Sequence, residues 1–220
     1  MTARDQVSPF KLASVLLQYP TLALLDGLGT LRAAAAGVSP RAAAGALGTF
    51  LDWLAATPPG QVAAHYVATF DLHRRCALYL TWYRHGDTRT RGMAMLQFTA
   101  AYRAAGFEPD PAELPDYLPM VLEFAALAPR GERLLAAHRA DLELLLDGLR
   151  GAPSPYASVV EAVCAQLPGL RRADLARVRR FRAEGGPPSE RVGLEAPWPP
   201  LPPAGARPIP PALPARQARP

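Results

Sequence analysis

The stretch PRGERLLAAHRADLELLLDGLRG, residues 129–151, is the longest helical pattern in the sequence. Apolar residues recur in it at helical spacing, whereas no segment of the chain alternates apolar and polar residues between hairpin turns. Several other apolar segments follow a Ser–Pro or Thr–Pro pair, which is typical of a helix start. These pairs are Ser8–Pro9, Ser39–Pro40, Thr57–Pro58 and Ser154–Pro155. The sequence therefore predicts an all-α fold, a single-domain multi-helix bundle of roughly nine or ten helices.

Proline distinguishes the C-terminal region from the rest of the chain. The chain has 220 residues, half of them hydrophobic, which is enough for one buried core. Residues 187–220, however, contain 12 of the 25 prolines. Proline removes backbone donors and favours extended polyproline-II geometry. We therefore expect an all-helical domain over residues 1–186 and a disordered proline-rich tail over residues 187–220.

The basic charge of the chain is also concentrated near its C-terminal end. The net charge is +5, but residues 1–167 contain 14 Lys and Arg against 15 Asp and Glu. Residues 168–186 contain 6 Lys and Arg against 2 Asp and Glu. Because the body of the chain is near neutral and shows no recognisable nucleic-acid-binding module, we expect no nucleic-acid partner. A nucleic-acid-binding protein that uses this basic helix stays a remote alternative.

The sequence lacks the marks of a membrane protein, an enzyme or a metalloprotein. No run of about 18 apolar residues predicts a transmembrane helix, and the N-terminal residues do not resemble a signal peptide, so we expect a cytoplasmic protein. No phosphate-binding loop, dinucleotide-binding fingerprint or nucleophile elbow occurs. His73 and Cys76 stand three apart, but no second pair with zinc-site spacing accompanies them. We therefore predict no catalytic residues and no metal site.

Polar and turn-forming residues gather in HGDTRTRG, residues 85–92. Two interpretations compete for this stretch: a catalytic centre, or a structural hub that shapes a binding groove. Gly86 is expected to end the helix before it, and Asp87 is expected to cap the helix after it.

Three aromatic residues precede this stretch. Tyr79, Trp82 and Tyr83 stand at positions i, i+3 and i+4 of an expected helix over residues 74–86, so they share one face of it. Such a face is either a core stripe or the lining of a groove, because buried Trp and Tyr need partners for their polar atoms. The spacing alone leaves both interpretations open.

An arginine heads an apolar stripe on the next expected helix. The stripe follows the spacing i, i+4, i+7 and i+11 and consists of Arg91, Met95, Phe98 and Tyr102. An arginine in this position either snorkels to solvent or pairs with a carboxylate. The nearest carboxylates in the sequence are those of Asp71, Asp87, Glu113 and Asp116. An ion pair with one of the last two would pin the loop ELPDY, residues 113–117, onto this helix.

The ELPDY loop has a structural and a chemical interpretation. Pro115 stiffens the loop, and Asp116 is placed to cap the following helix. Glu113 and Asp116 are three residues apart and also suggest acid–base chemistry. No His or Lys accompanies them in the motif, so the capping interpretation is favoured.

Together these motifs resemble the NarJ-type assembly chaperones of respiratory nitrate reductase, the nitrate reductase delta subunit family. The resemblance is carried by FD, LYLT-Y, GDTRxRG, GF and ELPDYLPxxLEF, and it is densest over residues 65–127. The wider group of redox-enzyme maturation chaperones has a similar E-x-P-D-H motif. This chain has Tyr117 at the last position of that motif, as the nitrate reductase branch does.

The resemblance implies a non-catalytic helical chaperone. It would bind the N-terminal segment of the apo catalytic (alpha) subunit of nitrate reductase and assist insertion of the molybdenum bis-guanine-dinucleotide cofactor, with no cofactor held stably by the chaperone. A chaperone for another molybdoenzyme is the alternative. The expected groove residues are Phe70, Tyr79, Trp82, Tyr83, Met95, Phe98, Tyr102 and Tyr117. The expected residues that organise the motifs are Asp71, Gly86, Asp87, Arg89, Arg91, Gly92, Glu113, Pro115 and Asp116.

Overall fold

The structure is a computed structural model, and it describes residues 8–187. Within this range the chain forms twelve α-helices and no strand, which confirms the all-α prediction. The helices are α1 (Pro9–Leu16), α2 (Leu22–Asp26), α3 (Leu28–Ala36), α4 (Arg41–Ala56), α5 (Pro59–Tyr66), α6 (Trp82–His85), α7 (Thr90–Arg103), α8 (Leu118–Leu127), α9 (Pro129–Ala137), α10 (Arg139–Gly151), α11 (Tyr156–Cys164) and α12 (Arg172–Glu184). A π-helical turn at Val67–Asp71 and a 3-10 turn at Arg74–Cys76 lie between α5 and α6. The predicted tail, apart from Pro187, lies outside the described residues.

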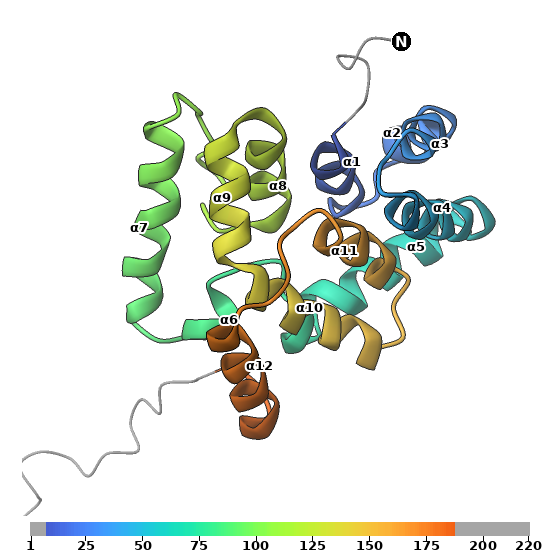
Figure 1. Ribbon diagram of the computed structural model, residues 1–220. Helices are drawn as coiled ribbons and strands as arrows, with labels where there is room; N and C mark the ends of the chain where they lie inside the picture. The colour runs from blue at the N-terminus through green and yellow to red at the C-terminus, as the bar shows by residue number, and fades with distance from the viewer. Residues whose placement is uncertain (1–7, 188–220) are drawn as a thin grey trace, which may run out of the picture. The chain divides into compact units, whose positions relative to one another are not determined.

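The helices pack around a core that is rich in aromatic residues. Helix α1 packs against α8 and α11, α4 packs against α3 and α11, and α8 packs against α9. Figure 1 shows α7 beside α9 at one edge of this bundle and α12 below α6 at another. The largest fully buried side chains include those of Phe50, Phe98, Tyr102, Phe124 and Tyr156. Burial of these rings from several helices is the main stabilising contribution to such a bundle.

Local signals in the sequence place several helix ends correctly. Ser8 is the N-cap of α1, with Pro9 in its first turn. Gly86 ends α6 with φ 52°, and Gly106 adopts φ 66° after α7. Positive φ is accessible to glycine because it has no Cβ, so the predicted stop at Gly86 is confirmed.

The prediction of one long helix over residues 129–151 is wrong. The chain turns at His138, which separates α9 from α10. The ring of His138 bonds through Nδ1 to Asp141 Oδ2 at 2.8 Å, and both side chains are buried. The turn lets α9 pack on α8 while α10 packs on α11. Sequence periodicity does not detect this break, because apolar residues continue through it.

None of the helices among the described residues is long and apolar enough to cross a membrane.

Candidate functional site

The aromatic residues before residue 85 do not share one helical face. Of the residues 77–86, only Trp82–His85 form an α-helix, because residues 77–80 are not helical and Tyr79 makes an isolated antiparallel bridge with Tyr117. Leu80 N donates to Asp116 O at 3.1 Å, and Leu118 N donates to Leu78 O at 2.7 Å. The prediction of a single helix over residues 74–86 is therefore wrong. Backbone pairing with a segment distant in the sequence replaces the helix there.

This bridge distributes the three aromatic side chains to different environments. Tyr83 is 3% exposed, and its hydroxyl donates to Ala77 O at 2.9 Å, so it belongs to the core. Trp82 is half-buried, and its indole N–H donates to Arg74 O at 2.8 Å. Tyr79 is also half-buried and packs on the ring of Tyr117 at a centroid distance of 5.5 Å. Tyr79 and Tyr117, rather than the predicted trio, form an aromatic pair at the junction of the two motifs.

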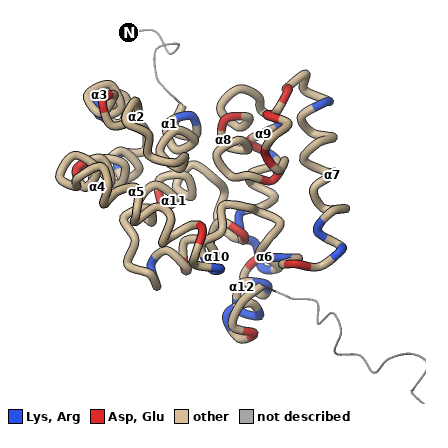
Figure 2. The backbone as a smooth tube through the Cα atoms, turned by 180° about the vertical axis from the view of Figure 1, so that it is seen from behind, with Lys and Arg blue, Asp and Glu red and all other residues tan. Residues whose placement is uncertain are grey.

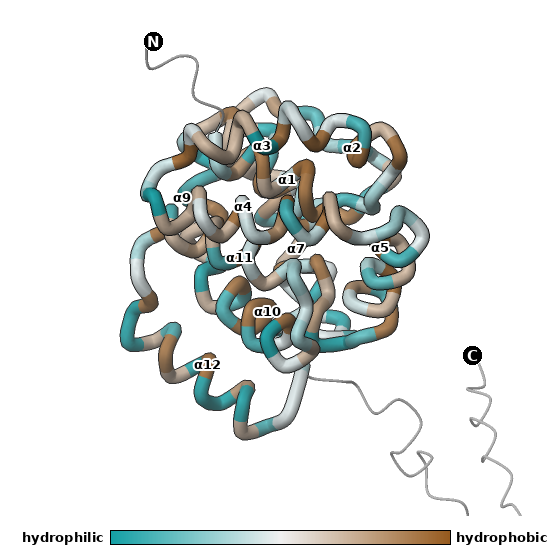
Figure 3. Tube along the Cα trace, turned by 90° about the vertical axis from the view of Figure 1, so that its right-hand side faces the viewer, coloured by the Kyte–Doolittle hydropathy of each residue, from teal (hydrophilic) through white to brown (hydrophobic). Residues whose placement is uncertain are grey.

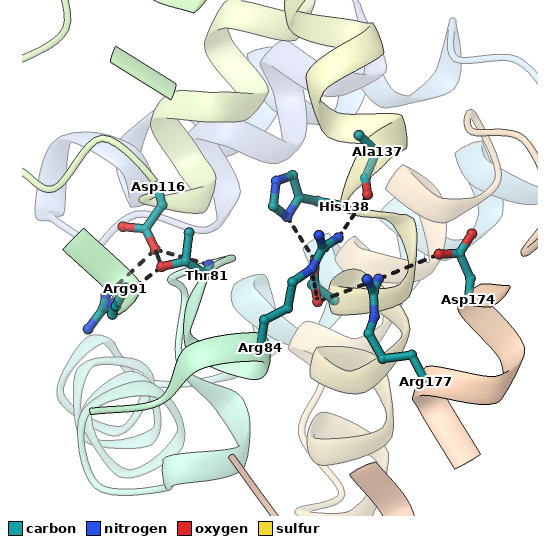
Figure 4. A network of polar contacts seen from close by, with 9 residues as sticks. Thr81, Arg84, Arg91, Asp116, Ala137, His138, Asp174 and Arg177 are labelled. Atoms are coloured by element: carbon teal, nitrogen blue, oxygen red, sulfur yellow. Dashed lines mark hydrogen bonds and ion pairs between the residues drawn. The ribbon is translucent and has the colours of Figure 1, made fainter. Parts of the chain in front are cut away.

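A buried carboxylate joins the two motifs below this pair. Asp116 is fully buried, and its Oδ2 accepts hydrogen bonds from Thr81 N at 3.0 Å and from Thr81 Oγ1 at 2.5 Å. Arg91 Nη2 lies 3.6 Å from the same oxygen, and Arg91 Nε donates to Thr81 Oγ1 at 3.2 Å. Figure 4 shows Thr81 and Arg91 converging on Asp116. The sequence predicts a role for Arg91 and Asp116 but not for Thr81, whose only signal is its place in the LYLT motif.

The predicted ion pair between Arg91 and the ELPDY loop thus forms with Asp116 and not with Glu113. Glu113 instead accepts the hydroxyl of Tyr79 at 3.1 Å. Burial, and to a lesser extent the neighbouring carboxylate of Glu113, raise the pKa of Tyr79 to about 12. The guanidinium of Arg91 also lies over the ring of Tyr79, with Cζ 5.4 Å from the centroid. Together these contacts hold the start of α7 and the ELPDY loop to residues 79–81.

Helix α7 is attached to the same loop at its other end. The hydroxyl of Tyr102 donates to Pro115 O at 2.7 Å. Phe98 and Tyr102 are fully buried and Met95 is half-buried, so the predicted stripe does face the interior. Phe98 packs on His138, and Tyr102 packs on Phe124. Phe98 and Tyr102 are therefore core residues, and the structure does not place them on an open surface.

The remaining predicted residues have mainly structural positions. Phe70 is 8% exposed and packs on Tyr66 and Tyr156. Asp87 does not cap α7, whose N-cap is Arg89, but forms an ion pair with Arg74 at 2.9 Å. Asp116 does not cap α8 either, because its carboxylate is turned toward Thr81 and the N-cap is Tyr117. The exposed residues of this set are Asp71, Asp87, Arg89 and Gly92.

Tyr117 also lines a pocket of about 450 Å³. This pocket lies between the turn after α1, the segment that precedes the ELPDY loop, and α8. Its lining residues are Gln18, Tyr19, Thr21, Phe107, Glu108, Pro109, Asp110, Glu113, Tyr117, Pro119, Met120 and Glu123. Of the predicted groove and motif residues, only Glu113 and Tyr117 line it. The sequence does not predict most of this pocket, because its lining residues come from segments that are far apart in the sequence and belong to different motifs.

The lining of this pocket combines apolar surface with negative charge. Aromatic rings and Met120 supply the apolar part, while Glu108, Asp110, Glu113 and Glu123 supply carboxylates. No Lys or Arg is among the lining residues. Lys11 binds Glu123 from outside the pocket. Such a lining is complementary to a segment that carries apolar and basic side chains. We call it the acidic pocket.

Comparisons with known proteins agree on one family. Residues 39–162 match the family described as nitrate reductase delta subunit. The chain is 30% identical over 172 residues to the probable nitrate reductase molybdenum cofactor assembly chaperone NarJ of Bacillus subtilis, which covers 77% of this chain and 94% of that protein. It is 37% identical over 123 residues to NarJ of Escherichia coli, which covers 55% of this chain and 52% of that protein.

Two further similarities have a narrower meaning. The nitrate reductase-like protein NarX of Mycobacterium tuberculosis is 44% identical over 154 residues, which are 69% of this chain but only 23% of NarX. A crystal structure of a putative redox enzyme maturation protein from Archaeoglobus fulgidus superposes with a TM-score of 0.53 and 22% identity, covering 71% of this chain and 90% of that chain. The latter likeness supports the fold alone.

Proposed function

Because this chain belongs to the nitrate reductase delta subunit family, we propose that it is an assembly chaperone for a respiratory nitrate reductase. It binds the apo catalytic subunit through the N-terminal segment of that subunit. In this state the client stays competent for insertion of the molybdenum bis-guanine-dinucleotide cofactor. The chain itself performs no catalysis and holds no cofactor stably.

The acidic pocket is the observation that supports this proposal most directly. A chaperone that receives a peptide segment needs an apolar groove with polar groups at its rim. Tyr19, Phe107 and Tyr117 offer aromatic surface, and the carboxylates around them attract basic side chains. We propose that the client segment occupies this pocket with its apolar side chains on the rings and its basic side chains at the rim.

The buried motif residues serve the pocket indirectly. Asp116, Thr81 and Arg91 fix the ELPDY loop, and this loop carries Glu113 and Tyr117 into the pocket wall. The HGDTRTRG stretch accordingly acts as a hub between two helices. No residue of this stretch is among those that line the acidic pocket. The stretch therefore affects the pocket only by positioning the ELPDY loop.

Calorimetry with a synthetic peptide tests this assignment. The peptide has the N-terminal sequence of the nitrate reductase catalytic subunit from the same source. We expect a dissociation constant between about micromolar and nanomolar, or roughly −8 to −12 kcal/mol. The double variant Glu108→Gln/Asp110→Asn weakens binding several-fold at low salt, because it removes two rim charges.

The matched control is Glu132→Gln, an exposed carboxylate on α9 that does not line the pocket. Equal weakening by the control and by the double variant would contradict the assignment of the pocket. No measurable heat with the wild-type protein, and tight binding of a segment from another molybdoenzyme, would favour a different client.

A further inference from the structure

Helix α12 lies outside the residues matched to the family and forms one wall of a second cleft. It packs on α10 and buries Val178 and Phe181, with the ring of Phe181 6.0 Å from that of Tyr83. Hydrophobic and hydrophilic positions are interspersed along this helix (Figure 3). Lys and Arg positions predominate on it (Figure 2). Its attachment leaves a recess between its basic side and the elements around α6.

Two pockets that share Glu184 make up this recess. The first, of about 230 Å³, is lined by Tyr83, Arg84, Arg177, Arg180, Phe181 and Glu184. The second, of about 280 Å³, is lined by Arg74, Arg75, Glu184, Gly185, Gly186 and Pro187. The two linings together contain five arginines and one carboxylate. We call the two pockets together the arginine cleft.

The carboxylate of Asp141 lies fully buried beside this cleft and is shared among several basic groups. Arg84 Nε donates to Asp141 Oδ2 at 2.9 Å, and His138 Nδ1 lies 2.8 Å from the same oxygen. Arg177 Nη2 lies 3.7 Å from Asp141 Oδ1 and 3.6 Å from Asp174 Oδ1. Figure 4 shows Arg84, His138 and Arg177 converging from different elements. Arg84 and His138 therefore hold the close positions around this carboxylate, and Arg177 stays beyond hydrogen-bond distance from it.

Arg177 is the group left without close acceptors. Its Nε and Nη2 atoms are buried and make no hydrogen bond with the described residues. Burial lowers the pKa of the Arg177 guanidinium, and the nearby charge of Arg84 lowers it further, although Asp141 acts in the opposite direction. Buried N–H donors without acceptors are costly. Arg177 lines the cleft, so an anion there would offset the repulsion between its guanidinium group and that of Arg84.

We propose that the arginine cleft binds a small phosphate-bearing ligand, with a diphosphate group as its best fit. Guanidinium groups match phosphate oxygens in paired hydrogen bonds, and arginine is the preferred residue for such contacts. The cleft has two adjoining parts, each lined by arginines, so two linked phosphates can occupy it together. Arg180 forms its ion pair with Glu184 at 3.5 Å, and an incoming phosphate competes with Glu184 for that guanidinium. The site is separate from the acidic pocket and does not depend on the proposed client.

The first experiment is titration of the full-length protein with inorganic pyrophosphate at constant ionic strength, followed by calorimetry. Fluorescence of the Trp53→Phe/Trp198→Phe variant, which retains only Trp82 of the three tryptophans, gives a second measurement. Trp82 reports on the cleft because Arg74 lies over its ring at 5.2 Å. We expect saturable binding that is about tenfold tighter than that of inorganic phosphate, because two groups are held in place of one. Sulfate at the same ionic strength is expected to compete about as weakly as inorganic phosphate, because it too offers a single tetrahedral oxyanion.

Variants locate the site. We expect Arg177→Ala and Arg180→Ala each to weaken pyrophosphate binding by about tenfold. The matched control is Arg179→Ala, an exposed arginine on the same helix that lines neither pocket, and it changes affinity by less than about twofold. Should Arg177→Ala fail to fold, Arg180→Ala still tests the site, because the Arg180 side chain is 76% exposed.

Three results would overturn the proposal. The first is no saturable binding at millimolar pyrophosphate. The second is equal loss in the Arg179 control, which would mean attraction by general charge. The third is sedimentation with phosphatidylglycerol vesicles that pyrophosphate does not reverse, which would assign the arginines to a lipid surface.

Discussion

Asp116 is the residue that joins the LYLT and ELPDY motifs through its carboxylate. It is fully buried, and only its Oδ2 has hydrogen-bond donors, both from Thr81. Arg91 is the nearby positive charge, and its side chain is 20% exposed. A buried charge that loses its partner is strongly destabilising, whereas a well-paired one contributes little net stability. The contacts of Asp116 with Thr81 and Arg91 therefore serve mainly to position the ELPDY loop, and they add little to the free energy of unfolding.

Removal of the arginine tests this dependence. We expect Arg91→Ala to lower the free energy of unfolding by about 1–3 kcal/mol, because it leaves Asp116 buried without a counter-charge. Urea denaturation measures the change. In a double-mutant cycle, Arg91→Ala and Asp116→Asn are coupled, whereas Arg91→Ala and Glu113→Gln are close to additive, since Glu113 bonds Tyr79 instead. Additive effects in the first cycle would show that Arg91 is only a snorkelling surface charge.

The hydroxyl of Tyr79 makes a pH-dependent contribution. Its pKa is raised from 10.0 to about 12, chiefly by burial and then by Glu113. The folded protein therefore retains this proton between pH 10 and pH 12 while the unfolded chain releases it. The resulting stabilisation is complete below pH 10 and is lost as pH rises through 12.

Comparison of the wild type with Tyr79→Phe isolates this contribution from those of the other buried tyrosines. We expect the stability advantage of the wild type over the variant to be constant below pH 10 and to fall between pH 10 and pH 12. Denaturant titrations at successive pH values give the difference, and ultraviolet absorbance counts the titrating tyrosinates. A difference that does not change over this range would mean that Tyr79 titrates as an exposed phenol.

At the scale of the elements, the sequence predicts helices where the determinants are local. The proline-led start of α1 and the glycine stop at Gly86 were predicted because backbone geometry at those positions depends on one or two residues. The bridge of Tyr79 with Tyr117 was not, because it requires a distant segment to supply backbone partners. The same holds for the acidic pocket. For Arg91, the sequence predicts a carboxylate partner in the ELPDY loop, because a charge at the head of a buried stripe needs one. It does not distinguish Asp116, which forms the pair, from Glu113.

Two glycines permit close helix packing in a way that substitution can test. A Cβ on Gly148 of α10 would lie 2.1 Å from Arg75 O, which is a backbone atom that cannot rotate away. We expect Gly148→Ala to destabilise the fold by about 2 kcal/mol or more through overpacking. Gly131 in α9 is similar, with Phe124 O at 2.4 Å.

The control for this prediction is Gly45 of α4, where an added Cβ meets nothing within 4 Å. Gly45→Ala is expected to raise the free energy of unfolding by about 0.5–1 kcal/mol, because alanine favours the helix. Thermal and urea denaturation of the purified variants give both values. Similar effects of Gly148→Ala and Gly45→Ala would mean that α10 does not approach Arg75 so closely.

At the scale of the whole molecule, α12 connects the C-terminal end of the described chain to the helical core. It is joined by Val178 and Phe181, by the pair of Arg177 with Asp141, and by that of Arg182 with Asp147 at 2.7 Å. The acidic pocket is lined by other elements. We therefore expect the stability of the fold to depend on α12 and client binding not to depend on it. Truncated chains can measure the two properties separately.

Two truncated chains measure this separation. Truncation after Gly186 removes only the proline-rich segment, residues 187–220, and we expect a nearly unchanged melting temperature, since such a composition buries little apolar area. Truncation after Leu170 also removes α12, exposes Tyr83 and leaves Asp141 with fewer partners. Loss of two buried apolar side chains, at about 1.5–3 kcal/mol each, corresponds to a fall on the order of 10 °C. Below that lowered transition, client-peptide affinity should match that of the full chain, because the acidic pocket is intact. A loss of peptide binding in the shorter chain at a temperature where it is still folded would show that α12 belongs to the client site.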